Sequence, residues 1–287
     1  MITETIENKN YWGGCKAGYY LYQFDGVQDF VNLPNPKSNE DNIQYWNGFE
    51  MNKKSTWLSP NGNTRKDIER FSKTGWTYGS KKSSDMINGL ALPHVKSVKR
   101  KRVRAEQGDE LDIHQVYRGQ ISTAWKRTKR LSRKTPKRFT LVCRLGGSCG
   151  ISSSELLWRG VATLALATAL TKAGHAVEIK AFSMNSGVYP SAKIKDRLDI
   201  VTVKSFSNPL DIDALANVLC LAGFFRHYIF KAWLQKEYRC PSGLGSMRNK
   251  DLQFKQSRQS TVIDVPQNRV QNKYNVERWL KETVEAL

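Results

Sequence analysis

Two runs of basic residues carry the clearest chemistry in this sequence. They lie in residues 96–104 and 126–138. Cationic side chains at this density repel one another unless a polyanion neutralises them, and the usual partner is the phosphate backbone of a nucleic acid. A solvated linker or a localisation signal is the alternative explanation. The residues that we expect to contact phosphate are Lys96, Lys99, Arg100, Lys101, Arg102, Arg104, Lys126, Arg127, Lys129, Arg130, Arg133, Lys134, Lys137 and Arg138.

The distribution of charge along the chain supports this interpretation. The chain has 287 residues and a formal net charge of +20. Residues 96–138 hold 15 basic and four acidic side chains, so more than half of the excess charge lies in less than a sixth of the chain. An acidic protein or a membrane surface is the other kind of partner that such a charge suits.

Aromatic residues beside the basic runs suggest how bases could be held. Trp125 directly precedes the second run, and Trp76 and Tyr78 precede the first. Each base stacked on an aromatic ring contributes about 1–3 kcal/mol to single-strand binding, although packing in a core is the commoner role of a tryptophan. The sequence has no helix-turn-helix, zinc-finger or heptad pattern for reading duplex DNA, so we expect single-stranded DNA as the ligand.

A glycine-rich segment, residues 146–150, lies between a predicted strand and a predicted helix. A helix that begins after such a turn favours anions, and the neighbouring Arg144 would assist in binding a backbone phosphate. The segment matches neither the P-loop nor the G-x-G-x-x-G pattern, so a nucleotide site is not expected and a tight turn is the default interpretation.

Catalytic patterns are weak. Glu178 and Lys180 form an E-x-K pair of the kind found in metal-dependent nucleases, but that chemistry needs a second carboxylate, for which Glu155 and Asp199 are the candidates. The histidines have no metal-ligand spacing, and no Ser-His-Asp signature is present. We therefore expect no enzyme, no cofactor and no metal ion, with a nuclease kept as an alternative.

The elements that must position these residues follow from hydrophobic periodicity. We predict strands over residues 19–24, 139–144, 175–182 and 198–206, and helices over 64–74, 152–173 and 211–235. Strand, helix and strand after residue 139 make a βαβ unit of a von Willebrand A-like or Rossmann-like α/β core. The expected organisation is an aromatic-rich α+β module (residues 1–95), a basic segment (96–138), the α/β core (139–239), and a polar linker with a C-terminal helix (240–287).

The C-terminal helix is predicted to begin at an Asn275 cap and to be amphipathic. Its apolar face includes Trp279 and Leu280, which would either dock on the protein's own core or bind a protein partner.

Membrane and secretory classes are not favoured. The longest apolar stretch, residues 161–170, is half of what a bilayer requires, and the first ten residues are polar and acidic. Five cysteines without a C-x-x-C pair indicate reduced thiols. We expect an intracellular protein without a membrane partner.

Residues 138–182 resemble a von Willebrand A-type core, which opens with a strand, a D-x-S-x-S metal-binding loop, a long helix and a second strand. Here the loop runs from Arg144 to Ser148, with Arg in place of the first Asp. The resemblance therefore implies a degenerate core without a divalent ion.

The wider arrangement is similar to a group of phage-encoded proteins. The likeness spans residues 20–236 and includes Lys204-Ser205-Phe206, Asn208-Pro209-Leu210-Asp211 and the segment 225–230. Some members of that group bind single-stranded DNA and recruit a phage RNA polymerase. The resemblance implies a transcription cofactor in the host cytoplasm; a structural or assembly protein that contacts the genome is the alternative. The sequence leaves the oligomeric state open, a homo-oligomer included.

Overall fold

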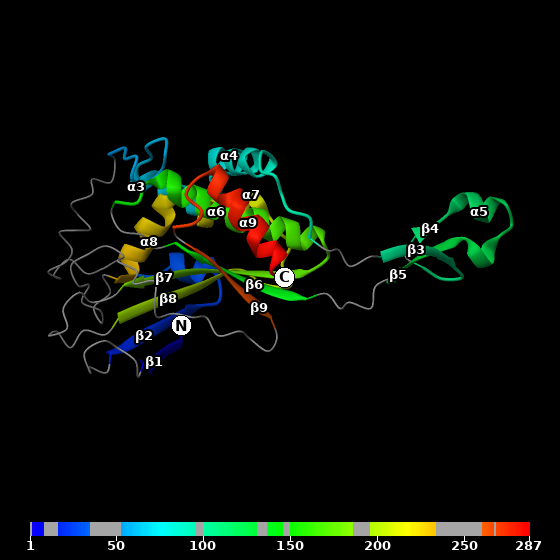
Figure 1. The fold of residues 1–287 in the computed structure, drawn as a ribbon, viewed down its shortest axis with the longest axis horizontal. Coiled ribbons are helices and arrows are strands. Elements are labelled where there is room, and N and C mark those ends of the chain that lie inside the picture. Colours follow the sequence, from blue (N-terminus) through cyan, green and yellow to red (C-terminus); the bar gives the residue numbers. More distant parts are fainter. Residues whose placement is uncertain are drawn as a thin grey trace.

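The main body of the protein is an α/β fold built on one mixed sheet (Figure 1). The computed structural model describes residues 2–8, 17–34, 53–95, 100–108, 110–130, 137–145, 150–185, 196–233, 260–266 and 268–287. In spatial order, the six strands of the sheet are β1 (Ile2–Asn8), β2 (Ala17–Phe24), β8 (Asp196–Lys204), β7 (Ala176–Asn185), β6 (Arg138–Arg144) and β9 (Thr261–Val265). The predicted α/β class is confirmed.

The centre of the sheet is the βαβ unit that the sequence predicted. Strands β6 and β7 are parallel, with Leu141 opposite Ile179, and β9 runs parallel to β6 on its other side. Strand β8 returns antiparallel to β7, and β2 pairs with β8 in parallel. Phe139 to Arg144 are all buried, as expected for a central strand rich in apolar residues.

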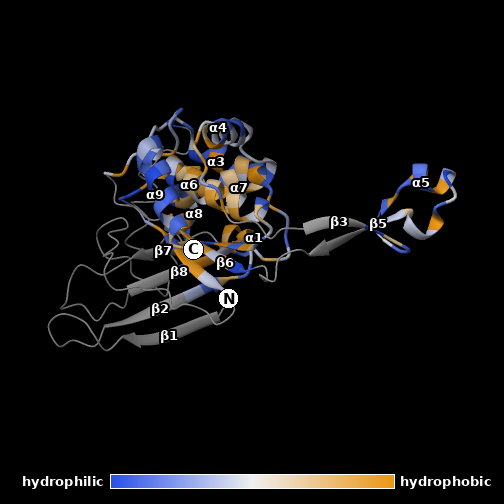
Figure 2. Cartoon of the chain, turned by 45° about the vertical axis from the view of Figure 1, so that its right-hand side comes forward, coloured by the Kyte–Doolittle hydropathy of each residue, from blue (hydrophilic) through white to orange (hydrophobic). Residues whose placement is uncertain are grey.

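Figures 1 and 2 show the helices gathered over one face of this sheet. The longest, α6, is buried over nearly its whole circumference because it lies between the sheet and further helices. The helices of the body are α1 (Val27–Val31), α3 (Arg65–Thr74), α4 (Thr77–Asn88), α6 (Ser153–Lys172), α7 (Ile212–Leu219), α8 (Ala222–Trp233) and α9 (Lys273–Glu285).

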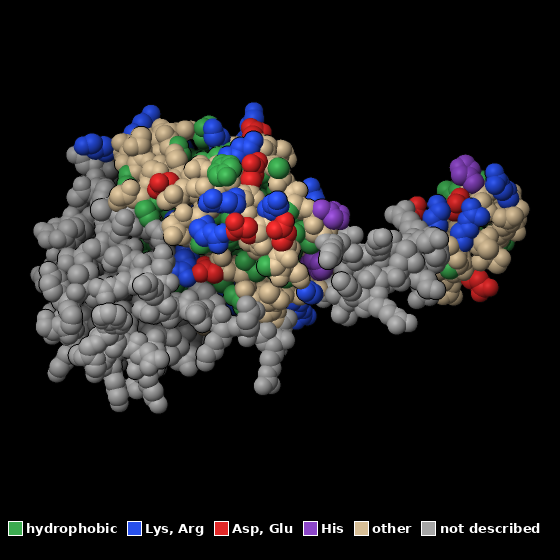
Figure 3. Space-filling view, in the orientation of Figure 1, with side chains coloured by type: hydrophobic (Ala, Val, Ile, Leu, Met, Phe, Trp, Pro, Cys, Tyr) green, Lys and Arg blue, Asp and Glu red, His purple; other side chains and the backbone are tan. Residues whose placement is uncertain are grey.

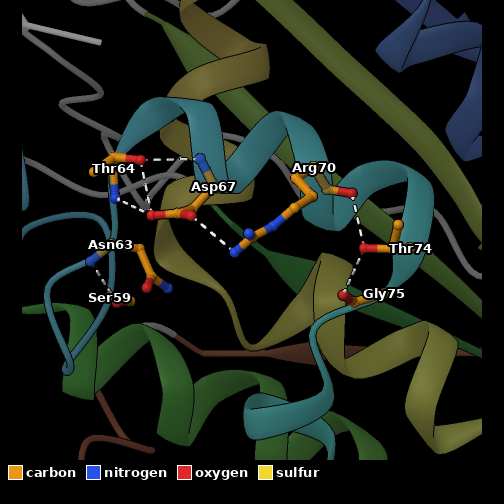
Figure 4. A network of polar contacts seen from close by, with 7 residues as sticks. All are labelled: Ser59, Asn63, Thr64, Asp67, Arg70, Thr74 and Gly75. Carbon is orange, nitrogen blue, oxygen red and sulfur yellow. Dashed lines mark hydrogen bonds and ion pairs between the residues drawn. The ribbon is translucent and has the colours of Figure 1, made fainter. Parts of the chain in front are cut away.

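Capping boxes fix the starts of two helices. In α6, the Ser152 hydroxyl accepts a hydrogen bond from Glu155 N (3.2 Å), and the Glu155 carboxylate accepts one from Ser152 N (3.1 Å). Figure 4 shows the same arrangement in α3, where Thr64 and Asp67 exchange hydrogen bonds of 3.0 Å and Arg70 pairs with Asp67. Both starts agree with the predicted helices.

The first 95 residues do not form a packing unit of their own. Strand β2 pairs with β8, so β1 and β2 extend the same sheet as the core strands. Tyr22, Phe24 and Phe30 belong to one hydrophobic cluster with α6 and α8. Among the described residues, the expected boundary at residue 95 therefore does not divide two hydrophobic cores. The N-terminal strands pair with the edge of β8 and so belong to the same sheet as the core strands.

The single helix expected over residues 211–235 is two helices. Asp211 caps α7 as predicted, but the chain bends by 58° between α7 and α8. The bend lets α7 pack on α4 and α6 while α8 packs on α3. Within the described part of the chain, no single helix is long and apolar enough to cross a membrane; the bent pair α7–α8 passes that test only when both are taken together, by length and composition.

The C-terminal region also differs from the prediction. Residues 261–265, expected in a linker, form β9 beside β6; much of the rest of that segment lies outside the described residues. Helix α9 begins at Lys273 with Asn272 as its cap, three residues before the predicted Asn275. Helix α4 was not predicted because its serines, threonine and glycine are weak helix formers, and packing against α6 and α7 overrides that preference.

Gly160 of α6 marks the closest helix contact. A Cβ added there would lie 2.3 Å from Leu219 O and 2.5 Å from Cys220 Sγ. Because the first of these atoms is backbone, Gly160→Ala must separate α6 from α7. We expect a loss of about 2 kcal/mol of unfolding free energy, measured by urea denaturation. Ala162→Gly, at a buried neighbouring position, would cost only about 1 kcal/mol, and equal losses would contradict the steric explanation.

Candidate nucleic-acid interface

The two basic runs are brought together in a second, smaller sheet. Strands β3 (Arg100–Ala105) and β5 (Trp125–Arg130) pair antiparallel, and the two-residue β4 (Glu110–Leu111) lies on the other side of β5. Figure 1 shows this ribbon projecting from the main body. We call β3 and β5 the basic ribbon. Lys96, Lys99, Arg133 and Lys134 lie outside the described residues.

The register of the basic ribbon places cations opposite cations. Arg100 pairs with Arg130, Lys101 with Lys129, and Arg104 with Lys126. Like charges directly opposite each other destabilise a β-ladder. Three such pairs are therefore unfavourable for the ladder by themselves.

The two faces of the ribbon differ in composition. Successive strand residues alternate between faces, so the register places Arg100, Arg102 and Arg104 on the same face as Lys126 and Arg130. The opposite face combines Lys101, Arg127 and Lys129 with Val103, Ala105 and Trp125. Same-face residues along a strand are about 6.8 Å apart. One face is thus a row of positive charge, and the other is partly apolar.

Acidic side chains offset the positive charge at the end of the ribbon where β5 meets β4 and the loop between β3 and β5. Lys126 Nζ lies 3.4 Å from Asp112 Oδ2, and Glu110 is opposite Lys126 in the β4–β5 ladder. The acidic residues described beside the ribbon therefore lie at its loop end.

Trp125 is only half-buried, at the junction of the ribbon and the loop. Its register partners are Ala105 on β3 and Leu111 on β4. Trp76 is buried in the main body, whereas Tyr78 is 48% exposed. Of the three aromatic residues predicted to stack, Trp125 alone belongs to the ribbon.

Lys137 and Arg138 lie at the root of the second run and contact the main body. Lys137 Nζ donates to the Leu287 backbone oxygen at 3.1 Å, and the Arg138 guanidinium lies 5.5 Å from the centre of the Phe206 ring. Both side chains remain exposed, but neither belongs to the ribbon.

Arg144 does not lie with the other predicted phosphate ligands. Its side chain is 8% exposed, and Arg144 Nε lies 3.0 Å from both carboxylate oxygens of Asp264 on β9. The guanidinium also lies 5.7 Å from the Phe182 ring centre. Because Asp264 already neutralises it, the expected role of Arg144 in binding phosphate is not supported by its position.

A second arginine beneath this pair was not singled out from the sequence. Arg159 of α6 is 1% exposed and donates a hydrogen bond to the Arg144 backbone oxygen. Burial lowers the pKa of Arg159 to about 10. The sequence did contain one signal for it, an arginine in the middle of a helix of leucines and alanines. Such a residue is buried with the helix, and a buried cation must have polar partners.

The predicted partner-binding residues are in the core. Trp279 is 4% exposed and Leu280 is fully buried, both packed with α6 in the hydrophobic cluster. The hypothesis that they bind another protein is therefore corrected: the apolar face of α9 covers the protein's own core. Figure 3 shows positive and negative side chains interspersed on this side of the body, and the α9 region carries the ion pairs Arg269–Glu282, Lys273–Glu277 and Lys281–Glu285.

The carboxylates of the nuclease alternative are far apart. Glu178 pairs with Lys180 at 3.5 Å and accepts a hydrogen bond from Thr140. Asp199 lies opposite Ser183, roughly 16 Å further along β7. Glu155 belongs to the α6 cap at the other end of β6. Within the described residues, no three His, Cys, Asp or Glu side chains come close enough to hold a metal ion.

A buried polar cluster joins α3 to α8. His227 Nδ1 accepts from Arg65 Nε at 3.4 Å, and His227 Nε2 lies 3.3 Å from a Glu69 carboxylate oxygen. Burial lowers the pKa of His227, a shift that the Glu69 hydrogen bond opposes and that Arg65 and Lys231 reinforce. The arrangement suits a neutral imidazole that donates to Glu69, and it ties the two helices together.

This cluster makes stability depend on pH. The unfolded chain binds a proton at His227 below its ordinary pKa of about 6.5, whereas the folded chain resists protonation until lower pH. We expect unfolding free energy to fall as pH decreases from about 6.5 to 5, and His227→Gln to reduce that dependence. Urea denaturation across this range measures it, with the exposed His114→Gln as control. An unchanged pH profile in His227→Gln would contradict the assignment.

Comparison with known proteins adds a family but no activity. Residues 4–285 match a family model described as "Domain of unknown function (DUF7192)". Comparisons with curated proteins and with solved structures found no match. The matched range includes the main sheet, its helices and the basic ribbon. Because the model matches nearly the whole chain, the protein belongs to the DUF7192 family of unknown function.

Proposed function

We propose that this protein binds single-stranded DNA without strong sequence preference, and that the basic ribbon holds the phosphates. The observation that carries the proposal is the cross-strand pairing of the two basic runs, with Arg100 opposite Arg130 and Lys101 opposite Lys129. Like charges placed directly opposite each other destabilise the ladder unless a polyanion binds and neutralises them. The main body then serves as the scaffold from which the ribbon projects.

The biological role follows from the resemblance given above. We propose a phage transcription cofactor that binds single-stranded DNA and recruits an RNA polymerase in the host cytoplasm. The described residues support the DNA-binding half of this role; the polymerase half rests on the resemblance.

We also propose that the core is a degenerate von Willebrand A-like domain without a divalent ion. The succession of β6, α6 and the parallel strand β7 supports the likeness. Arg144 stands where the family begins its metal-binding loop, and its guanidinium pairs with the Asp264 carboxylate. Mg²⁺ or EDTA should leave the unfolding midpoint unchanged; a midpoint raised by Mg²⁺ would overturn this part.

The test is fluorescence anisotropy with matched single-stranded and duplex DNA over a salt series, with and without Mg²⁺. If about six phosphates are neutralised, log affinity should fall with log salt at a slope near −4, using the single-strand coefficient. A slope near zero would overturn the proposal.

The duplex arm is required because a two-stranded β-ribbon also fits the major groove. Tighter binding to duplex than to single-stranded DNA would identify duplex DNA as the ligand. Cleavage in Mg²⁺ that disappears in Glu178→Ala would establish the nuclease alternative.

A further inference from the structure

The loop that closes the basic ribbon exposes an unusual amount of apolar surface. Large hydrophobic side chains that are more than a third exposed number eight in the described part of the chain, and five of them lie in residues 111–121. Tyr117 is 86% exposed and Ile121 is 68% exposed. The others are Leu111, Ile113 and Val116. We call residues 111–123 the apolar tip; Figure 2 shows hydrophobic positions around α5 (Ile113–Tyr117) within it. Exposed apolar side chains that gather in this way mark a binding site.

Local hydrogen bonds hold the tip in one conformation. Asp112 N donates to Ala124 O at 2.7 Å, and Gln120 N donates to Gln115 O at 3.0 Å. Gly119 turns the chain after α5 with a φ of +74°, a conformation that residues with a Cβ rarely adopt. Ala124 and Gln115 are buried beneath this turn. The exposed side chains are therefore presented by an ordered loop, which lowers the entropy cost of binding.

The chemistry of the tip differs from that of the ribbon. Residues 111–123 contain one acidic residue, Asp112, and one arginine, Arg118, and Glu110 directly precedes them, so the tip is not a phosphate site. It offers instead an exposed aromatic ring with aliphatic side chains beside it. Planar, uncharged nucleobases match this surface, because aromatic side chains stack on bases and aliphatic ones insert between them.

The tip continues directly from the ribbon. Leu111 is opposite Trp125, and Glu110 is opposite Lys126, in the ladder that joins β4 to β5. A nucleic acid whose phosphates follow the ribbon therefore brings its bases to the tip.

We propose that the apolar tip is the base-contacting part of the DNA site, with Tyr117 as the stacking platform and Ile113 and Ile121 beside it. The inference rests on the proposed function, because the ribbon must bring the DNA to the tip. The ligand chemistry is the face of a nucleobase. That face is available in a single strand, or in a duplex at a step opened by an apolar wedge.

The experiment compares Tyr117→Ala with Tyr117→Phe on a single strand, on the same strand with abasic sites, and on the matched duplex. We expect Tyr117→Ala to weaken single-strand binding about tenfold at an unchanged salt slope, while Tyr117→Phe keeps wild-type affinity. Abasic sites should weaken the wild type by a similar factor and leave Tyr117→Ala unaffected. A tenfold loss confined to the duplex would identify an opened base step as the source of the bases.

The control is Tyr274→Ala, which removes a tyrosine that is 69% exposed on α9, away from the ribbon. It should bind as the wild type does. If the wild type binds with a steep salt slope and Tyr117→Ala matches it on every ligand, the inference about the tip is overturned and the tip becomes a candidate protein contact. If the wild type shows no salt-dependent binding, the proposed function itself fails.

Discussion

Replacing Arg100, Arg102 and Arg104 together with glutamine should weaken single-strand binding about 100-fold at about 0.1 M salt. The three residues share one face of β3, and each phosphate contact contributes about 0.7 to the salt slope. Losing three contacts lowers the magnitude of the slope by about 2, which corresponds to two decades of affinity between 1 M and 0.1 M salt. Anisotropy titrations at several salt concentrations measure both quantities.

The matched control removes the same charge from the main body. Lys73, Lys81 and Lys82 are exposed on α3 and α4. Their triple glutamine variant should keep affinity within a few fold and should keep the salt slope. Equal losses in the two triple variants would mean that net charge alone, without a localised site, attracts the DNA.

The ribbon variant should also become more stable as it loses function. Arg100→Gln and Arg104→Gln each remove a like-charge pair, opposite Arg130 and Lys126, and such pairs change ladder stability by about 0.2–1 kcal/mol. Hydrogen exchange of the ribbon amides is expected to slow in the absence of DNA. Faster exchange would indicate that these arginines stabilise the ribbon itself, and it would contradict the view that they are unfavourable without a ligand.

The second large effect is expected at the Arg144–Asp264 pair. Asp264→Ala removes the carboxylate that neutralises a guanidinium only 8% exposed, and breaking a buried pair in this way costs about 3–5 kcal/mol. Since Asp264 is itself 35% exposed, we expect the lower end, about 3 kcal/mol. Urea denaturation monitored by tryptophan fluorescence measures the loss.

Two companion variants separate structure from binding. Arg144→Leu should cost less than Asp264→Ala, because the remaining carboxylate is partly hydrated, and the double variant should recover part of the loss. The DNA salt slope should be unchanged in Arg144→Leu. A slope reduced by about 0.7 would instead return Arg144 to the phosphate ligands.

Much of the core was predictable because its signals are local. The β-branched run after residue 138, the Ser152–Glu155 capping box and the stop at Gly174 define β6 and α6 without tertiary information. Thr64 and Gly75 likewise delimit α3. In each case hydrogen bonds within one turn, or the pattern of one strand, determine the element.

Features that depend on distant partners were not predictable. The α7–α8 bend has no glycine or proline at Cys220 or Leu221, and it follows from packing on different helices. Strand β9 is short, and Asp264 is 120 residues from Arg144, so neither the strand nor its ion pair is visible in local sequence.

The sequence by itself determined where the charge and the apolar faces are. It placed the cations in residues 96–104 and 126–138 and gave α9 an apolar face that includes Trp279. Tertiary structure decided what each of these faces meets. It pairs the two basic runs in one ribbon, exposes the tip between them and buries Trp279 against α6. The physical reason is that composition and periodicity fix the chemistry of a surface, whereas its partner is fixed only when strands and helices distant in sequence compete to cover it.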